Sequence, residues 1–193
     1  MLRPTPTGEL LTGTPKYADL VRRNTSFATM NTSTVAALVV RPSTAAAFEI
    51  YNPTTSGVSL IIDRLFWFEL VSATLIEAAS GWAQVTTPNR VAAAPTDGSF
   101  AVRGNNGNAY SGATIAAAAT TVIASGWFPW ANLVMARPVS AAVTPMGVAI
   151  AEVDGRLIVQ PGGSLCLHAV ASTTAGTFTQ GASWFEEAIV NVT

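Results

Sequence analysis

The chain alternates short apolar runs with turn-forming residues, most clearly from residue 146 to the C-terminus. The apolar segments there are separated by Asp154-Gly155, by Pro161-Gly162-Gly163 and by residues 174–177. Asp-Gly between two apolar runs favours a type I′ hairpin turn, which needs positive φ at both central residues. Pro-Gly-Gly favours a second chain reversal. The pattern therefore predicts four antiparallel strands at the end of the chain.

The middle of the chain carries further strand patterns. Residues 58–70 form a run of β-branched and aromatic residues, which predicts a central strand, with residues 73–84 as its partner. Shorter strands are predicted at 34–41, 48–52 and 114–125. We therefore expect an all-β fold, an antiparallel β-sandwich or jelly roll of about eight strands with glycine and proline turns.

Residues 1–45 differ from the rest of the sequence. Proline and glycine recur through the first sixteen residues, which predicts an extended N-terminal arm before a jelly-roll β-sandwich domain at residues 46–193. Residues 17–23 are expected to form two helical turns at most. The arm is either a disordered terminus or a segment that orders against a partner subunit. The second alternative is favoured by apolar residues that a solvated tail would lack: Leu2, Leu10, Leu11, Tyr17 and Leu20.

Composition adds a reason to expect assembly. Hydrophobic residues make up 49% of the chain, but charged residues only 11%, against roughly 25% in typical soluble domains. Solubility normally depends on mixed surface charge. We therefore expect much of the surface to be buried against copies of this chain or against another protein.

Charge and hydropathy argue against two classes of partner. The net charge is −1, and the closest basic cluster is the pair Arg22-Arg23, so nucleic-acid binding is not expected. The N-terminus lacks the apolar segment of a signal peptide, and the low-charge stretch 109–135 is interrupted by Gly112, Gly126 and Pro129. We expect no membrane span and synthesis in a cytoplasm.

The residues give no pattern for catalysis, a metal site or a cofactor. His168 is the only histidine and Cys166 the only cysteine, so a multi-histidine or cysteine metal site is not expected. No Gly-x-Ser-x-Gly nucleophile motif occurs, and Gly162-Gly163-Ser164 is explained by a turn. The adjacent Glu186 and Glu187 would point to opposite faces of a strand. We do not expect an enzyme.

Two aromatic clusters provide the positive signal: Phe66-Trp67-Phe68 and Trp127-Phe128-Pro129-Trp130. Consecutive rings in a strand cannot all face one core, because side chains alternate between the two faces. The second face either lies under a loop or forms a subunit interface, where large aromatics are enriched. The charge deficit favours the interface, and its candidate aromatic residues are Trp67, Trp127 and Trp130.

Three segments together resemble small jelly-roll virion proteins of tailed bacteriophages. They are the stretch from Asn52-Pro-Thr-Thr-Ser-Gly to Asp63-Arg-Leu, the stretch Ile158-Val-Gln-Pro-Gly-Gly-Ser-Leu, and Ser183-Trp-Phe-Glu-Glu. The likeness runs from about Phe48 to the C-terminus and lies in strand and turn style, so it carries over no functional residue. The first 45 residues match no family that we can name.

The resemblance implies a capsid cement or decoration protein. Proteins of this kind commonly sit as trimers over the junctions between capsomers, so we expect a homotrimer that binds the major capsid protein on the virion surface. An alternative is a receptor- or glycan-binding module of a phage tail or fibre, in which Trp82 or Trp130 stacks on sugars. An enzyme is the third alternative.

Overall fold

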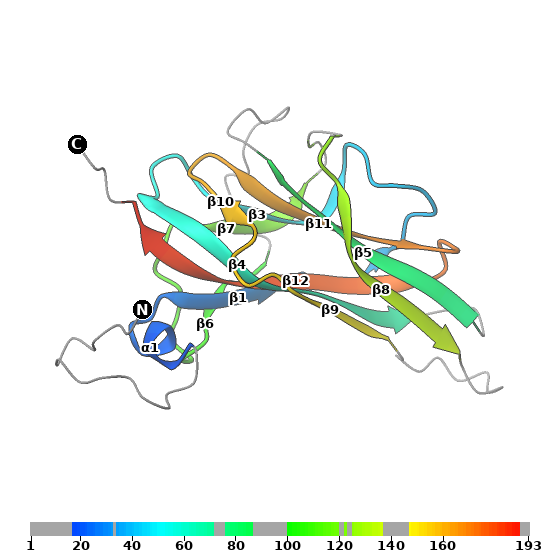
Figure 1. The fold of residues 1–193 in the computed structure, drawn as a ribbon, viewed down its shortest axis with the longest axis horizontal. Helices are drawn as coiled ribbons and strands as arrows, with labels where there is room; N and C mark the ends of the chain where they lie inside the picture. Colours follow the sequence, from blue (N-terminus) through cyan, green and yellow to red (C-terminus); the bar gives the residue numbers. More distant parts are fainter. Residues whose placement is uncertain are drawn as a thin grey trace.

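The computed structural model describes residues 17–32, 34–71, 76–86, 100–119, 122, 125–136 and 147–189. Two antiparallel sheets pack face to face and form two layers (Figure 1). The all-β sandwich predicted from the sequence is thereby confirmed. A short helix of five residues, α1 (Ala18–Arg22), lies at one end of the molecule, which agrees with the expectation of two helical turns at most.

The first sheet has the order β10-β4-β12-β1-β6, with β9 also paired to β4 and β2 to β12. Its strands are β1 (Ser26–Met30), β2 (Val35–Ala36), β4 (Val58–Val71), β6 (Arg103–Gly104), β9 (Val148–Glu152), β10 (Ile158–Val159) and β12 (Thr177–Ala188). The pairing of β4 with β12 runs along nearly the whole of both strands. Residues 58–70 therefore form a central strand, as the β-branched run predicted.

The second sheet has the order β7-β3-β11-β5-β8. Its strands are β3 (Ala46–Tyr51), β5 (Ile76–Thr86), β7 (Ile115–Ala119), β8 (Phe128–Ala136) and β11 (Ser164–Ala171). The predicted partnership between residues 58–70 and 73–84 is wrong, because β5 pairs with β11 and β8 in this sheet rather than with β4. Strands β4 and β5, which are consecutive along the chain, therefore lie in different sheets.

The strand order is that of a jelly roll. If β9 and β10 are counted as one edge strand, the four longest members of the first sheet lie in the order β1, β12, β4, β9/β10. The second sheet is built from β3, β11, β5 and β8 in that order, with β7 added at the β3 edge. Along the chain these eight strands change sheet at every step except between β5 and β8, which pair within the second sheet, and they form two Greek keys.

The four predicted C-terminal strands exist, but the predicted hairpins between them do not. Asp154 and Gly155 both have positive φ, at 51° and 78°, as a type I′ turn requires. The flanking strands β9 and β10 nevertheless lie end to end on β4 instead of pairing with each other. Turn chemistry fixes the local backbone, whereas burial in the sandwich decides which strand each segment joins.

The next two connections cross between the sheets. Pro161-Gly162-Gly163 leads from β10 in the first sheet to β11 in the second, and residues 172–176 lead back to β12. A Cβ on Gly163 would lie 2.7 Å from the carbonyl oxygen of Thr86, so the crossing brings two backbones too close together for a side chain.

The predicted boundary at residue 45 does not hold for residues 26–30. These residues form β1, which pairs with β12 along its full length. Phe27 packs edge-on against Tyr110 with ring centroids 4.8 Å apart, inside the main core. Residues 1–16 of the predicted arm, which include Leu10 and Leu11, lie outside the described residues.

The core between the sheets centres on large aromatic side chains. Trp67 from the first sheet is 1% exposed, and its indole lies against Gly81 of the second sheet, where a Cβ would come within 2.4 Å of the ring. Trp184 and Phe178 of β12 are also buried in this core. The absence of a side chain at position 81 therefore lets the widest residue of the core fit between the two sheets.

Candidate interaction surface

The outer face of the first sheet carries a row of apolar side chains. Cross-strand pairing aligns Met30 of β1, Gly181 of β12, Phe66 of β4 and Ile150 of β9. The next outward row brings Phe68 beside Val148. We call the five side chains Met30, Phe66, Phe68, Val148 and Ile150 the apolar stripe.

Three members of the apolar stripe are open to solvent. Met30 is 41% exposed, Val148 51% and Ile150 54%, whereas Phe66 and Phe68 are half-buried. A shallow depression of about 270 Å³ continues beside Met30 and Phe66 towards β6. On the other side of the stripe, the row of Arg64 and Glu152 is polar, with an ion pair of 2.9 Å. The stripe is therefore an apolar patch on the outer face of the first sheet, and it ends at a polar row on this side.

Phe66 lies close against its own sheet because its neighbour across the strands is a glycine. A Cβ on Gly181 would lie 2.4 Å from the Phe66 ring and 2.3 Å from the carbonyl oxygen of Thr29. The rings of Phe66 and Phe68 are 5.5 Å apart at their centroids. This close packing lays aromatic surface along the outer face of the sheet.

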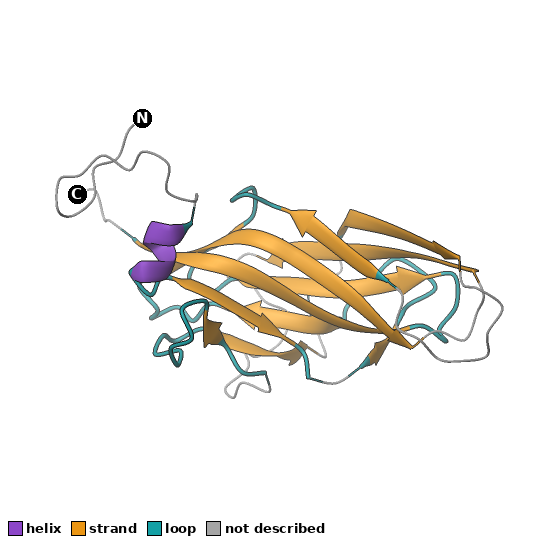
Figure 2. Cartoon of the chain, turned by 90° about the horizontal axis from the view of Figure 1, so that it is seen from below, coloured by secondary structure: helices purple, strands orange, loops and turns teal. Residues whose placement is uncertain are grey.

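At the other end of the same face, α1 covers the sheet (Figure 2). The Tyr17 ring stacks on Phe185 with centroids 4.9 Å apart, and the Tyr17 hydroxyl donates a hydrogen bond of 2.9 Å to Asp154 Oδ1. Asp19 and Arg23 form an ion pair of 2.8 Å across one helical turn. The two contacts of Tyr17 attach the start of α1 to β12 and to the turn between β9 and β10.

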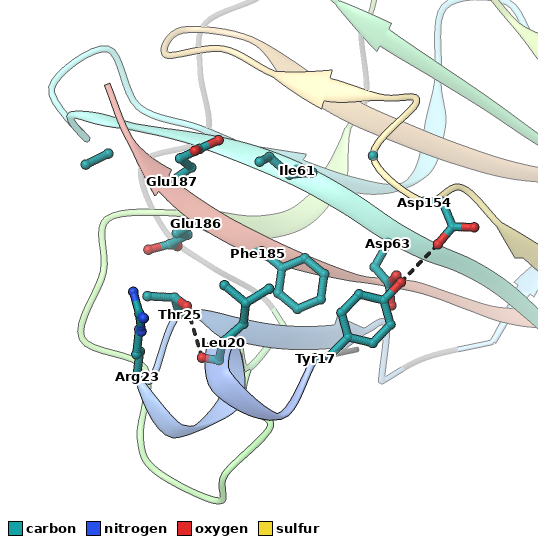
Figure 3. Close-up of a pocket in the computed structure, with 12 residues that line it drawn as sticks. Tyr17, Leu20, Arg23, Thr25, Ile61, Asp63, Asp154, Phe185, Glu186 and Glu187 are labelled. Carbon is teal, nitrogen blue, oxygen red and sulfur yellow. Dashed lines mark hydrogen bonds between the residues drawn. The ribbon is translucent and has the colours of Figure 1, made fainter. Parts of the chain in front are cut away.

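A pocket of about 690 Å³ opens beside α1 (Figure 3). Apolar and aromatic walls come from Tyr17, Leu20, Ile61 and Phe185, and the pocket also has carboxylate groups along its lining. Two predicted interface residues, Tyr17 and Leu20, thus lie together at this pocket. They contact the chain's own sandwich, and whether they also contact a second subunit stays a prediction.

The outer face of the second sheet is covered by the chain itself. Trp127 is 2% exposed and packs with Val122 against Ala46 and Cys166 in a second, smaller hydrophobic cluster. Its Nε1 donates a hydrogen bond of 2.9 Å to the carbonyl oxygen of Ser43. The polar side chains of Glu49 and Gln84 are buried on the same face.

This arrangement corrects the prediction for two of the interface residues. Trp67 lies between the sheets and Trp127 lies in the smaller cluster, so neither has surface to offer a partner. Trp130 is half-buried, and the Arg156 guanidinium lies over its ring, 5.5 Å from the centroid. In both aromatic clusters the outward rings belong to phenylalanine: Phe66 and Phe68 in one, and Phe128, which is 65% exposed, in the other.

Phe66 and Phe68 of the apolar stripe belong to an aromatic cluster that the sequence indicated, but Met30, Val148 and Ile150 were not singled out. A signal existed in Val148-Ala-Ile-Ala-Glu, where large and small residues alternate with strand period, so that one face carries only the large ones. The structure buries Ala149 and Ala151 and exposes Val148 and Ile150. The same alternation is compatible with the opposite assignment, in which the large residues face the core.

His168 and Cys166 also lie on the outer side of the second sheet, beneath covering residues. His168 is 5% exposed, and its burial lowers its pKa, an effect larger than the opposing one of the Ala169 carbonyl oxygen 3.0 Å from Nδ1. Among the described residues, no group of three or more His, Cys, Asp or Glu side chains is placed to hold a metal ion. Nor does the described part of the chain contain a helix long and apolar enough to cross a membrane.

Comparisons of the chain with protein-family models, with curated proteins and with solved structures found no match.

Proposed function

We propose that this protein is a structural subunit of a larger protein assembly, and that it acts as a cement or decoration protein on the capsid of a tailed bacteriophage. The apolar stripe carries the proposal. Large exposed apolar patches on soluble proteins mark interaction sites. The jelly-roll order and the low charge of the chain support the same reading, and the choice of a phage capsid follows the resemblance of the sequence.

The stripe provides a physical means of holding neighbouring subunits together. Fully burying an exposed Val, Ile or Met side chain contributes about 1.5–3 kcal/mol, and the three open members of the stripe, which are about half exposed, can each contribute about half of that. A homotrimer multiplies this effect, because each copy raises the effective concentration of the others at the shell. In this proposal the major capsid protein is the partner and the capsid surface is the location.

The test combines two substitutions in the stripe, Val148→Asn and Ile150→Asp. A matched control changes two exposed valines outside the stripe, Val39→Asn and Val40→Asp. Both variants are co-expressed with the major capsid protein of the same phage. Occupancy on purified shells is measured by quantitative gel analysis, and self-association by sedimentation velocity. We expect the stripe variant to lose occupancy or self-association while the control retains both. Full retention of both by the stripe variant contradicts the proposal.

The alternative of sugar stacking on Trp82 or Trp130 fits the geometry less well. Arg156 occupies one face of the Trp130 ring, and Trp82 is half-buried with its Nε1 donating to Ser80 Oγ at 2.8 Å. Sugar-binding aromatic platforms need an open ring face. A glycan-array signal that is lost on Trp130→Ala and kept in the stripe variant would replace the capsid proposal with this one.

A further inference from the structure

We propose that the pocket beside α1, the α1 pocket, binds a cationic side chain, preferentially arginine, presented by a partner protein. The inference is separate from the proposed function, because it concerns a different end of the sheet and other residues. At about 690 Å³ the pocket lies in the size range of ligand sites. Its chemistry, rather than its size, identifies the occupant.

Acidic groups outnumber basic ones in the pocket lining. Four acidic residues contribute to the lining, Asp63, Asp154, Glu186 and Glu187, against one basic residue, Arg23. Arg23 already forms an ion pair with Asp19. Glu186 accepts a hydrogen bond of 2.7 Å from the Tyr110 hydroxyl on the inner side of the strand. The local field therefore favours a positively charged group.

Asp63 provides the second observation, independent of the number of acids. It is 6% exposed, and no group in the described part of the chain donates a hydrogen bond to its buried Oδ1. Its Oδ2 is 3.9 Å from Arg64 Nε, too far for a hydrogen bond, and that nitrogen donates to Glu152 at 2.9 Å instead. A buried carboxylate oxygen without a donor is destabilising, and Asp63 lines the pocket, so a guanidinium or ammonium group that enters the pocket stabilises the charge of this carboxylate.

The backbone holds Asp63 and Asp154 in fixed positions relative to each other. The amide nitrogens of Val153 and Asp154 both donate to the carbonyl oxygen of Asp63, at 2.7 and 3.0 Å, and Gly155 N donates to Ile62 O at 2.8 Å. Figure 3 shows Tyr17, Asp63 and Asp154 at the same end of the pocket. The acidic end is therefore organised before any ligand arrives, which limits the entropy cost of binding.

The rest of the lining suits the aliphatic part of a basic residue. Leu20, Ile61 and the Tyr17 ring form apolar walls that methylene groups can contact while the charged head reaches the carboxylates. Arginine is favoured over lysine because its planar group can donate to two carboxylates at once and is more weakly hydrated. The pocket thus combines an apolar entrance for the stem with an acidic end for the head.

The experiment titrates the full chain with N-acetyl-arginine N-methylamide and, separately, with the neutral near-isostere N-acetyl-citrulline N-methylamide. Backbone amide chemical shifts of Leu20, Ile61 and Gly155 report binding by NMR. We expect saturable shifts at these amides for the arginine probe, and affinity roughly tenfold lower for the citrulline probe. Equal affinity for both probes, or no saturable shift at these amides, overturns the inference.

Two variants locate the binding. Asp63→Asn removes the charge of the buried carboxylate, and Asp154→Asn removes the second charge with a residue that tolerates positive φ. Each is expected to weaken the arginine probe by roughly tenfold. Arg103→Gln removes an exposed charge of the first sheet that lies outside the pocket and should leave binding unchanged. If Asp154→Asn is folded and binds like the parent chain, the assignment of the acidic end is wrong. The stripe variant should keep the arginine site, so the two proposals fail separately.

Discussion

The two sheets differ in how their outer faces are covered. The face with buried polar side chains is covered by the chain, whereas the face with the apolar stripe is exposed. On the second sheet, Trp127 and Val122 bury a face that includes polar side chains such as Glu49, Gln84 and His168. On the first sheet, the apolar stripe is exposed beyond α1. Folding alone would favour covering the apolar face. The difference supports the proposal that a partner covers the first sheet, whereas residues of the chain itself cover the second sheet.

Removing the cover of the second sheet tests the comparison most strongly. Trp127→Ala should lower the free energy of unfolding by about 3–5 kcal/mol, because it leaves a cavity in the smaller cluster and an unpaired Ser43 carbonyl. Urea denaturation measures the change. The adjacent Phe128→Ala, at a 65% exposed position, should stay within about 0.5 kcal/mol. Similar losses in the two variants would mean that Trp127 does not seal the face.

A second test probes the packing between the two sheets. Gly81→Ala should cost about 1–3 kcal/mol of unfolding free energy, because the new methyl group meets the Trp67 ring. Combining it with Trp67→Phe should cost less than the sum of the two single changes, since the smaller ring makes room. Strict additivity in thermal or urea denaturation would show that the methyl group is accommodated elsewhere.

The covered face should also respond to pH. Because burial lowers the pKa of His168 below its ordinary value of 6.5, the unfolded chain takes up the proton first. The stability due to the neutral ring is complete above about pH 6.5 and is lost as pH falls through the folded-state pKa, at no more than about 1.4 kcal/mol per pH unit. His168→Gln should flatten this slope in urea denaturation series. If the slope of the unfolding free energy against pH does not change, the pH dependence comes from other groups.

The open face should give the smallest effect on stability. Ile150→Thr removes apolar surface from a strand position that is 54% exposed and keeps a β-branched residue. We expect the free energy of unfolding to change by less than about 0.5 kcal/mol, while self-association measured by sedimentation velocity weakens. A loss as large as that of Trp127→Ala would mean that the stripe is part of the chain's own core, and the contrast between the faces would disappear.

Local sequence patterns predicted where the strands lie better than they predicted which strands pair. The β-branched run at 58–70 became β4, and Asp154-Gly155 adopted the positive φ values that Asp-Gly favours. Pairing was missed, because the strand that β5, β9 or β10 joins depends on burial across the whole sandwich. Strand β1 was missed as well, since only Phe27 in that short segment signals a core position.

The predicted interface shows a limit of a different kind. The sequence indicated that Phe66-Trp67-Phe68 must present rings on both faces of a strand, and Trp67 faces inward while Phe66 and Phe68 face outward. The choice of Trp67 as the interface residue was wrong because a one-residue change of register exchanges the two faces. The α1 pocket could not be found locally, since it joins α1, β4, β12 and the turn after β9.

The turn at Asp154-Gly155 has a consequence for how copies of the chain can meet. It divides the boundary strand of the first sheet into β9, of five residues, and β10, of two. A long uninterrupted boundary strand is a template for strand addition from other molecules, and such growth has no natural end. A charge-poor protein is especially vulnerable to it. By breaking that template, the turn removes a route to open-ended strand addition at this edge of the sheet.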